Sequence, residues 1–194
     1  MRLFEKHFHI TSRTRILDVG GSPEIWEIAS ASPQLTILNL PSALGPRRPG
    51  TLCIGGDGRM LPFADQSFDI VFSNSVIEHV GTLADQRLFA EEVARVGRHY
   101  WVQTPNRRFP VELHVMLPFI HFLPKSAQRS IVSRFTIWQH VTHPTPAVRR
   151  DYIHHFLNEL NLLDTARLRQ LFPGARILSE RLLGIPKSLI AVRS

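Results

Sequence analysis

The sequence predicts a single-domain α/β protein built on a mostly parallel sheet. Apolar, strand-like runs alternate with helical patterns as far as residue 103, which is typical of parallel βαβ units. The chain has 194 residues, of which 43% are apolar, and this is enough for one domain with a substantial core. The last two strand patterns are joined by only about five residues, too few for a parallel crossover, so the last strand should be antiparallel.

The first strand is predicted over residues 15–19. A cap residue, a first-turn proline and a first-turn acid follow in Ser22-Pro23-Glu24, so a helix should begin there and run to about residue 30. Period and composition then predict strands over 35–40, 51–54, 68–73 and 98–103, a loop over 41–50 and a helix over 82–96.

The pattern changes after residue 103, where prolines, aromatics and basic residues accumulate. Residues 104–150 carry 7 Lys or Arg against 1 Asp or Glu, whereas residues 1–103 carry 10 against 11. We interpret 104–163 as a basic, aromatic-rich substrate cap within a single domain spanning 1–194. A helical lid whose apolar side packs on the sheet and whose arginines are solvated would give the same pattern. Regular structure resumes at Asp164, which should cap a short helix ending before Pro173-Gly174, followed by strands over 175–182 and 187–193.

Polar residues follow several of these strands. Asp18-Val-Gly-Gly-Ser22 lacks the glycine spacing of a dinucleotide-binding loop, which argues against a nicotinamide oxidoreductase, and its acid would repel phosphate. The ligand should therefore be neutral or cationic. Asn39, Asp57 and the run from Ser73 end later strands, and the carboxyl ends of parallel strands meet in one cleft.

In these motifs, residues 15–103 resemble the class I S-adenosylmethionine-dependent methyltransferases, in particular the small-molecule, type 11-like group. The ending, from Phe172-Pro-Gly174 through Lys187-Ser-Leu-Ile-Ala191, is similar to the closing strands of that fold. The resemblance implies a Rossmann-like seven-stranded sheet, mostly parallel with an antiparallel last strand, and a helical insertion after strand five. It also implies S-adenosyl-L-methionine as the cofactor.

The resemblance further implies a role for each matching residue. Asp18 and Gly20, with Gly21 and Ser22, would lie by the methionine end of the cofactor. Asn39 would contact the ribose, although the family usually has an acid there and a more glycine-rich first loop. The remaining cofactor contacts are expected from Asp57, from the backbone of Gly58 and Arg59 at the adenine, and from Ser73 and Asn74 under the sulfonium.

We expect an enzyme that transfers a methyl group to a small or lipid-linked acceptor, with an anionic acceptor favoured by the basic cap. His79, just past strand four, is the candidate general base, although a histidine packed against the sheet would fit the same position. The chain lacks the Asp/Asn-Pro-Pro-aromatic stretch that enzymes methylating amino groups of nucleic-acid bases usually carry after strand four.

Two other interpretations remain open: a non-catalytic binding module with the same fold, and an RNA-binding or RNA-modifying protein. Residues 111–123 are apolar enough for peripheral membrane contact, although Pro118 interrupts them. The His140-x-x-His143 pair has no carboxylate or cysteine at ligand spacing, so we expect no metal. The first residues do not resemble a secretory signal, and a cytoplasmic location is expected.

Overall fold

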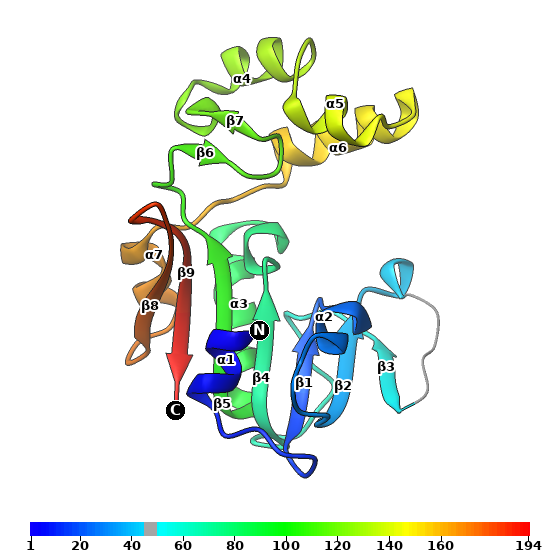
Figure 1. The fold of residues 1–194 in the computed structure, drawn as a ribbon, viewed down its shortest axis with the longest axis vertical. Helices are drawn as coiled ribbons and strands as arrows, with labels where there is room; N and C mark the ends of the chain where they lie inside the picture. The colour runs from blue at the N-terminus through cyan, green and yellow to red at the C-terminus, as the bar shows by residue number, and fades with distance from the viewer. Residues whose placement is uncertain (45–49) are drawn as a thin grey trace.

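The computed structural model describes residues 1–44 and 50–194, which contain a seven-stranded sheet of order β3-β2-β1-β4-β5-β9-β8 (Figure 1). The first five strands in this order are mutually parallel, and β9 is antiparallel to both of its neighbours. The strands are β1 (Arg15–Val19), β2 (Gln34–Asn39), β3 (Thr51–Gly55), β4 (Phe68–Asn74), β5 (Gly97–Pro105), β8 (Arg176–Leu182) and β9 (Ile185–Arg193). The predicted Rossmann-like fold class is confirmed.

Helices cover both faces of the sheet. On one face, α3 (Leu83–Val96) and α7 (Thr165–Leu171) bury Phe89, Val93 and Leu168 against the strands. The other face carries α1 (Arg2–His7) and α2 (Pro23–Glu27), and it is rich in aromatic rings. Phe4 of α1 lies edge-on to the rings of Phe72 and Trp101, which explains why a short helix that the sequence pattern did not indicate is held on the sheet.

Helix α2 ends at Glu27, about one turn earlier than predicted. The reason is tertiary, because Ser30 donates hydrogen bonds from its backbone nitrogen and its hydroxyl to Glu5 Oε1 at 2.6 and 2.8 Å. These contacts draw residue 30 toward α1 instead of extending α2. The predicted loop over 41–50 lies partly outside the described residues, and its first part forms η1 (Pro41–Ala43).

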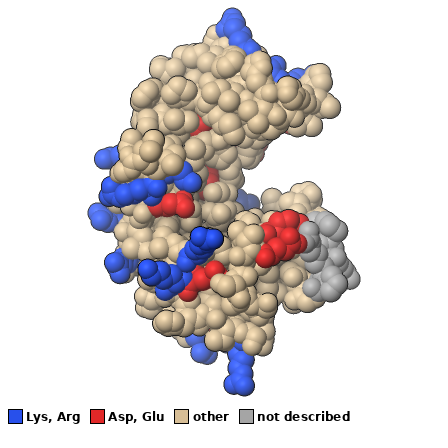
Figure 2. Space-filling view, in the orientation of Figure 1, with Lys and Arg blue, Asp and Glu red and all other residues tan. Residues whose placement is uncertain are grey.

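The insertion after β5 forms a lobe beyond the carboxyl ends of the parallel strands (Figure 1). It contains β6 (Val111–Glu112), β7 (Leu117–Pro118), η3 (Ile120–Phe122), α4 (Lys125–Val132), α5 (Ile137–Thr142) and α6 (Pro146–Asn158). Six buried apolar residues, Val115, Leu117, Ile120, Val132, Phe156 and Leu157, give the lobe its own small core. Figure 2 shows a hollow between this lobe and the sheet.

The helices of the described residues are all too short or too polar to cross a bilayer. Peripheral membrane contact by residues 111–123 and a cytoplasmic location stay predictions.

Candidate active site

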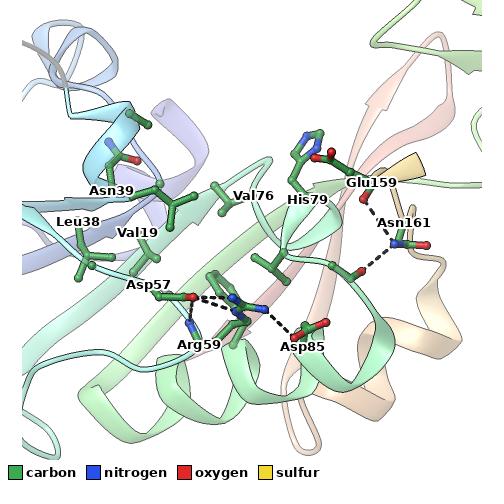
Figure 3. Close-up of a pocket in the computed structure, with 18 of the residues that line it drawn as sticks. Val19, Leu38, Asn39, Asp57, Arg59, Val76, His79, Asp85, Glu159 and Asn161 are labelled. Carbon is green, nitrogen blue, oxygen red and sulfur yellow. Dashed lines mark hydrogen bonds and ion pairs between the residues drawn. The ribbon is translucent and has the colours of Figure 1, made fainter. Parts of the chain in front are cut away.

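A cavity of about 540 Å³ lies at the carboxyl ends of β1, β2 and β4, between the sheet and the returning end of the insertion (Figure 3). This volume is within the usual range for a small-molecule site. Apolar side chains such as Leu38, Leu40 and Val76 form much of its wall. The predicted site residues that line it are Gly20, Asn39, Asp57, Gly58, Arg59 and His79.

Asp18 does not line the cavity. Its carboxyl group is fully buried beneath the β1–α2 loop, where Oδ2 accepts a hydrogen bond of 2.7 Å from Trp26 Nε1. Its Oδ1 has no hydrogen-bond partner in the part of the chain that the structure describes. Burial raises the pKa of Asp18 to about 7, against the smaller lowering effect of the Trp26 hydrogen bond. The structure therefore places this acid behind the cavity wall instead of on its surface.

The two glycines after β1 have separate structural tasks. Gly20 has a φ of +78°, and a Cβ there would lie 2.5 Å from Val76 Cγ2. A Cβ on Gly21 would lie 1.8 Å from Asp18 Oδ2. Gly21 thus makes room for the buried carboxyl group and does not line the cavity, and neither does Ser22, the N-cap residue of α2.

Ser73 and Asn74 also lie away from the cavity, on opposite sides of β4. Ser73 is buried and donates a 3.0 Å hydrogen bond to the carbonyl oxygen of Val19, while Asn74 lines a different hollow beside α1. The chain then turns at Ser75, which has a φ of +58°, and it is Ser75 and Val76 that line the cavity. Ser73 and Asn74, which were predicted to lie under the sulfonium, thus do not line the cavity, and the two residues that follow them do.

Asn39 lies at the end of β2 and lines the cavity as predicted. Its Nδ2 donates a 2.7 Å hydrogen bond to the carbonyl oxygen of Gly21. The amide therefore ties β2 to the glycine loop, and its oxygen remains available as an acceptor on a half-buried surface.

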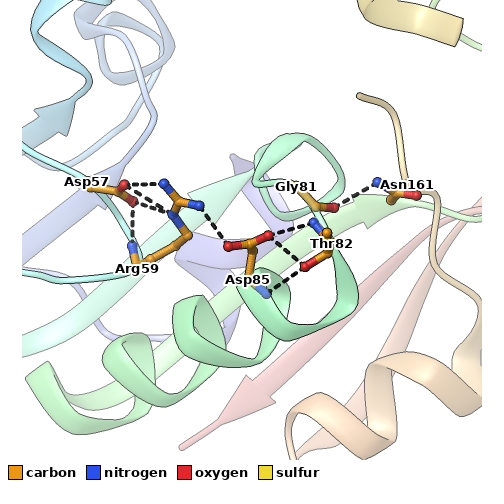
Figure 4. Close-up of polar contacts among 6 residues, drawn as sticks. All are labelled: Asp57, Arg59, Gly81, Thr82, Asp85 and Asn161. Carbon is orange, nitrogen blue, oxygen red and sulfur yellow. Dashed lines mark hydrogen bonds and ion pairs between the residues drawn. The ribbon is translucent and has the colours of Figure 1, made fainter. Parts of the chain in front are cut away.

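Asp57 is held in an ion-pair network (Figure 4). Arg59 contacts Asp57 Oδ2 at 2.6 Å and Asp85 Oδ1 at 2.7 Å, and Asp85 also completes a capping box with Thr82 at the start of α3. The hydrogen bonds from Arg59 lower the pKa of Asp57, so that this carboxylate is ionised at neutral pH. Arg59 is the only Lys or Arg among the described residues that line the cavity, and both of its partners are acids.

His79 lies on the cavity wall at the end of η2 (Ile77–His79), and it is the centre of a cluster of histidines. Its Nε2 is 3.2 Å from His114 Nε2, and its Nδ1 is 2.8 Å from His155 Nε2. Burial, followed by the charges that His114 and His155 can carry, lowers the pKa of His79 to about 4. The ring is therefore neutral at pH 7.

Acids surround this cluster. Glu112 is buried, and its Oε1 is 2.6 Å from His114 Nδ1. Burial opposes protonation of His114, but the hydrogen bond and charge of Glu112 outweigh it and the net pKa of His114 is raised. Glu78 is also buried, and burial raises its pKa to about 7.

Sequence reasoning missed Glu78 and His114. The adjacent Glu78-His79 pair and the Glu112-x-His114 spacing were visible, but they lie 33 residues apart or more, in segments whose proximity no local pattern indicates. It also missed Thr82, Asp85 and Asn161 as lining residues. Asn161 Nδ2 donates to the carbonyl oxygen of Gly81 at 2.7 Å and so fixes the end of the insertion at the cavity rim.

Two arginines of the insertion, Arg149 and Arg134, bind to other residues of the lobe. Arg149 donates to Gln139 Oε1 and to the carbonyl oxygen of Ser133, both at 2.6 Å. Arg134 contacts Ser130. The insertion residues that line the cavity are Asn158, Glu159 and Asn161. Among the described residues, therefore, no lysine or arginine of the insertion lines this cavity, where the sequence had suggested contacts with an anionic acceptor.

Comparison with known proteins agrees with this fold. Residues 30–99 match the family model described as a methyltransferase domain, and no curated protein matches the chain. A Haloferax volcanii methyltransferase, solved in a complex with the Trm112 methyltransferase activator, has 15% identity and a TM-score of 0.60 over 98% of this chain and 86% of its own.

Two further structures show the same fold. A Methanosarcina mazei protein described as a SAM-dependent methyltransferase has 15% identity and a TM-score of 0.56 over 96% of this chain and 94% of its own. A Rhodobacter sphaeroides protein described as a zinc-dependent alcohol dehydrogenase has 11% identity and a TM-score of 0.64 over 98% of this chain and 86% of its own. At these identities the structural likeness establishes the fold, and residues 30–99 carry the similarity to the methyltransferase family model.

The chain has a Rossmann-like α/β fold, and residues 30–99 within it are similar to the methyltransferase family model. The resemblance to the class I, type 11-like S-adenosylmethionine-dependent methyltransferases is thereby confirmed.

Proposed function

We propose that this protein is an S-adenosylmethionine-dependent methyltransferase that acts on a small acceptor molecule. The observation that carries the proposal is the cavity at the carboxyl ends of β1, β2 and β4, within and beside the segment that matches the methyltransferase family. The family match and the SAM-dependent Methanosarcina mazei neighbour support the expected cofactor.

The residues present fit that cofactor. Gly20 has no side chain, so its backbone is exposed where the methionine end is expected, and a Cβ there would collide with Val76. Asn39 offers an amide oxygen to the ribose. Leu40 and the Asp57–Gly58 turn would hold the adenine by apolar contact and hydrogen bonding. The carboxylates of Asp57, Asp85 and Glu159 on the wall suit a ligand with positive charge and no phosphate.

The bound cofactor would supply a methyl group on a positively charged sulfur, which an acceptor atom takes by in-line displacement as the carbon–sulfur bond breaks and S-adenosylhomocysteine is left. The protein must then position the acceptor, exclude water and receive any proton that the acceptor loses. We propose His79 for the last task, directly or through its histidine neighbours, because it lines the cavity and is neutral at pH 7. The carboxylates of Asp57, Asp85 and Glu159 on the cavity wall favour a neutral or cationic acceptor over an anionic one.

Leu40→Ala is expected to weaken S-adenosylmethionine binding by about five- to tenfold, because it removes apolar contact worth about 1 kcal/mol or more. Leu52→Ala is the matched control, since Leu40 and Leu52 are 54% and 59% exposed but only Leu40 lines the cavity. Isothermal titration calorimetry with S-adenosylmethionine measures both variants. Absence of binding to the wild type would refute the proposed function. Equal losses of S-adenosylmethionine affinity in both variants would show that the cofactor does not bind in this cavity.

Asn39→Asp is expected to reduce cofactor affinity by about tenfold, although an acid is the usual residue of the family at this position. The substitution removes the hydrogen bond to the carbonyl oxygen of Gly21 and puts a carboxylate oxygen next to it, at a cost of about 1–2 kcal/mol. Calorimetry provides the measurement, and Asn39→Ala separates loss of the amide from carboxylate repulsion. Tighter binding by Asn39→Asp would show that the amide does not anchor the loop in the bound state.

A further inference from the structure

We propose that Glu78, His79 and His114 form a binding site for a divalent transition metal, with Zn²⁺ as the best match. One ligand atom from each residue lies within 4.8 Å of the others. Two imidazoles and a carboxylate are a common donor set for zinc that keeps a further position open. The site borders the cavity, because His79 belongs to both. A metal on His79 Nε2 would occupy the nitrogen that could receive the acceptor's proton, so His79 takes up a proton only in the metal-free state. Metal binding itself can be measured without the cofactor.

The spacing of the two imidazoles agrees with a metal between them. His79 Nε2 and His114 Nε2 are 3.2 Å apart. Two nitrogens bound at about 2.0–2.1 Å to a tetrahedral zinc would be separated by about 3.3 Å. Glu78 Oε1 is 4.0 Å from His79 Nε2, so a small movement of the carboxylate would complete the set.

Glu78 itself points to a missing partner. Its side chain is fully buried, and Oε2 accepts a hydrogen bond of 2.9 Å from Thr104 Oγ1. Among the described residues, Oε1, which faces His79, has no hydrogen-bond partner. A buried carboxylate oxygen without a donor is costly, and a cation at this position would satisfy it.

The outer nitrogens of the histidines are already oriented as metal ligands require. His114 Nδ1 lies 2.6 Å from Glu112 Oε1, and the other oxygen of Glu112 accepts from the backbone of Val115 at 2.9 Å. His79 Nδ1 lies 2.8 Å from His155 Nε2, and His155 Nδ1 lies 2.6 Å from Glu159 Oε2. Such contacts, made directly to a carboxylate or through a second histidine, fix the tautomer of a ligand histidine and leave the lone pair of its Nε2 free to bind the metal.

A count of protons also favours a cation. The chain from Glu112 through His114, His79 and His155 to Glu159 contains four close contacts, and each needs one proton. Three neutral imidazoles supply three. A fourth proton would complete the chain, but it would leave Glu78 Oε1 without a partner. A metal between the two Nε2 atoms removes the need for the fourth proton and satisfies Glu78 at the same time.

The test is zinc binding by the full chain after treatment with a chelator. Elemental analysis and calorimetry with Zn²⁺ alone should show one ion per chain, and Co²⁺ in its place should give visible d–d absorption. Glu78→Gln and His114→Ala should each lower zinc affinity by more than about a hundredfold, and Glu112→Gln by about 10- to 100-fold. A His140→Ala/His143→Ala double variant is the matched control, because it removes two insertion histidines outside this cluster, and it should bind zinc as the wild type does.

Circular dichroism and S-adenosylmethionine binding by the metal-free variants show whether each still folds. Absence of stoichiometric zinc binding in the wild type overturns the site, and so does retention of zinc by folded Glu78→Gln and His114→Ala. Loss of zinc only in the His140/His143 control would assign the ion to the insertion instead. Zinc binding without cofactor binding would uphold the site while refuting the proposed function.

Discussion

Through Asp18 alone, the protein is expected to lose about 3 kcal/mol of unfolding free energy between pH 5 and pH 8, and Asp18→Asn is expected to abolish that loss. Burial raises the pKa of Asp18 to about 7 in the folded protein, from 3.8 for the free group. Between these values the unfolded chain releases the proton and the folded protein retains it, so stability falls as the pH rises, by about 1.4 kcal/mol per unit.

Asparagine has nearly the same shape and can still accept the hydrogen bond from Trp26, but it does not ionise. It can also bury an unpaired N–H, which adds a constant offset of about 1–3 kcal/mol at every pH. The measurement is therefore the slope of unfolding free energy against pH, from urea titrations of both proteins at pH 5, 6, 7 and 8.

Asp69→Asn is a control, because the pKa of Asp69 is shifted in the opposite direction from that of Asp18. The hydrogen bond from Arg15 lowers the pKa of Asp69, so this carboxylate stabilises the fold above its unfolded pKa and the benefit is lost in acid. The effect should be small because both partners are partly exposed, and it should leave the slope between pH 5 and pH 8 unchanged. Parallel curves for wild type and Asp18→Asn would mean that Asp18 ionises at an ordinary pKa.

Gly20→Ala is expected to destabilise the protein by about 3 kcal/mol and to lower its melting temperature by about 6–12 °C. Two costs combine at this position. The φ of +78° disfavours any L-side chain, and the new Cβ would lie 2.5 and 2.8 Å from the two methyl groups of Val76. Because Gly20 and Val76 both line the cavity, cofactor affinity should fall as well.

Gly184→Ala separates the two costs. Gly184 has a φ of +80°, but a Cβ there would have no heavy atom within 4 Å, so only the backbone cost of about 1–2 kcal/mol applies. The double variant Gly20→Ala/Val76→Ala should recover the remainder by removing the clash. Thermal unfolding measures all three variants. If Gly20→Ala and Gly184→Ala cost the same, Val76 does not restrict the glycine loop.

Much of the site could be predicted because it depends on strand ends. Asn39 and Asp57 lie where parallel strands finish, and the topology of an open α/β sheet brings those ends together. Ser73 and Asn74 do not line the cavity, because the exit of β4 depends on one residue, Ser75, with positive φ. Pleating sends Ser73 and Asn74 to opposite sides, and no pattern in the sequence marks which residue then turns into the cavity.

The sequence by itself determined the sheet, its antiparallel last strand and the polar residues at the strand ends, because hydrophobic period, turn residues and link length act locally. The tertiary structure alone decided that Asp18 is buried behind the cavity wall and that Arg149 forms its hydrogen bonds within the lobe. It also decided the meeting of Glu78, His79 and His114. That meeting depends on how the insertion folds back over the sheet, through contacts such as Asn161 with Gly81, and side chains so far apart in sequence become neighbours only when the whole chain packs.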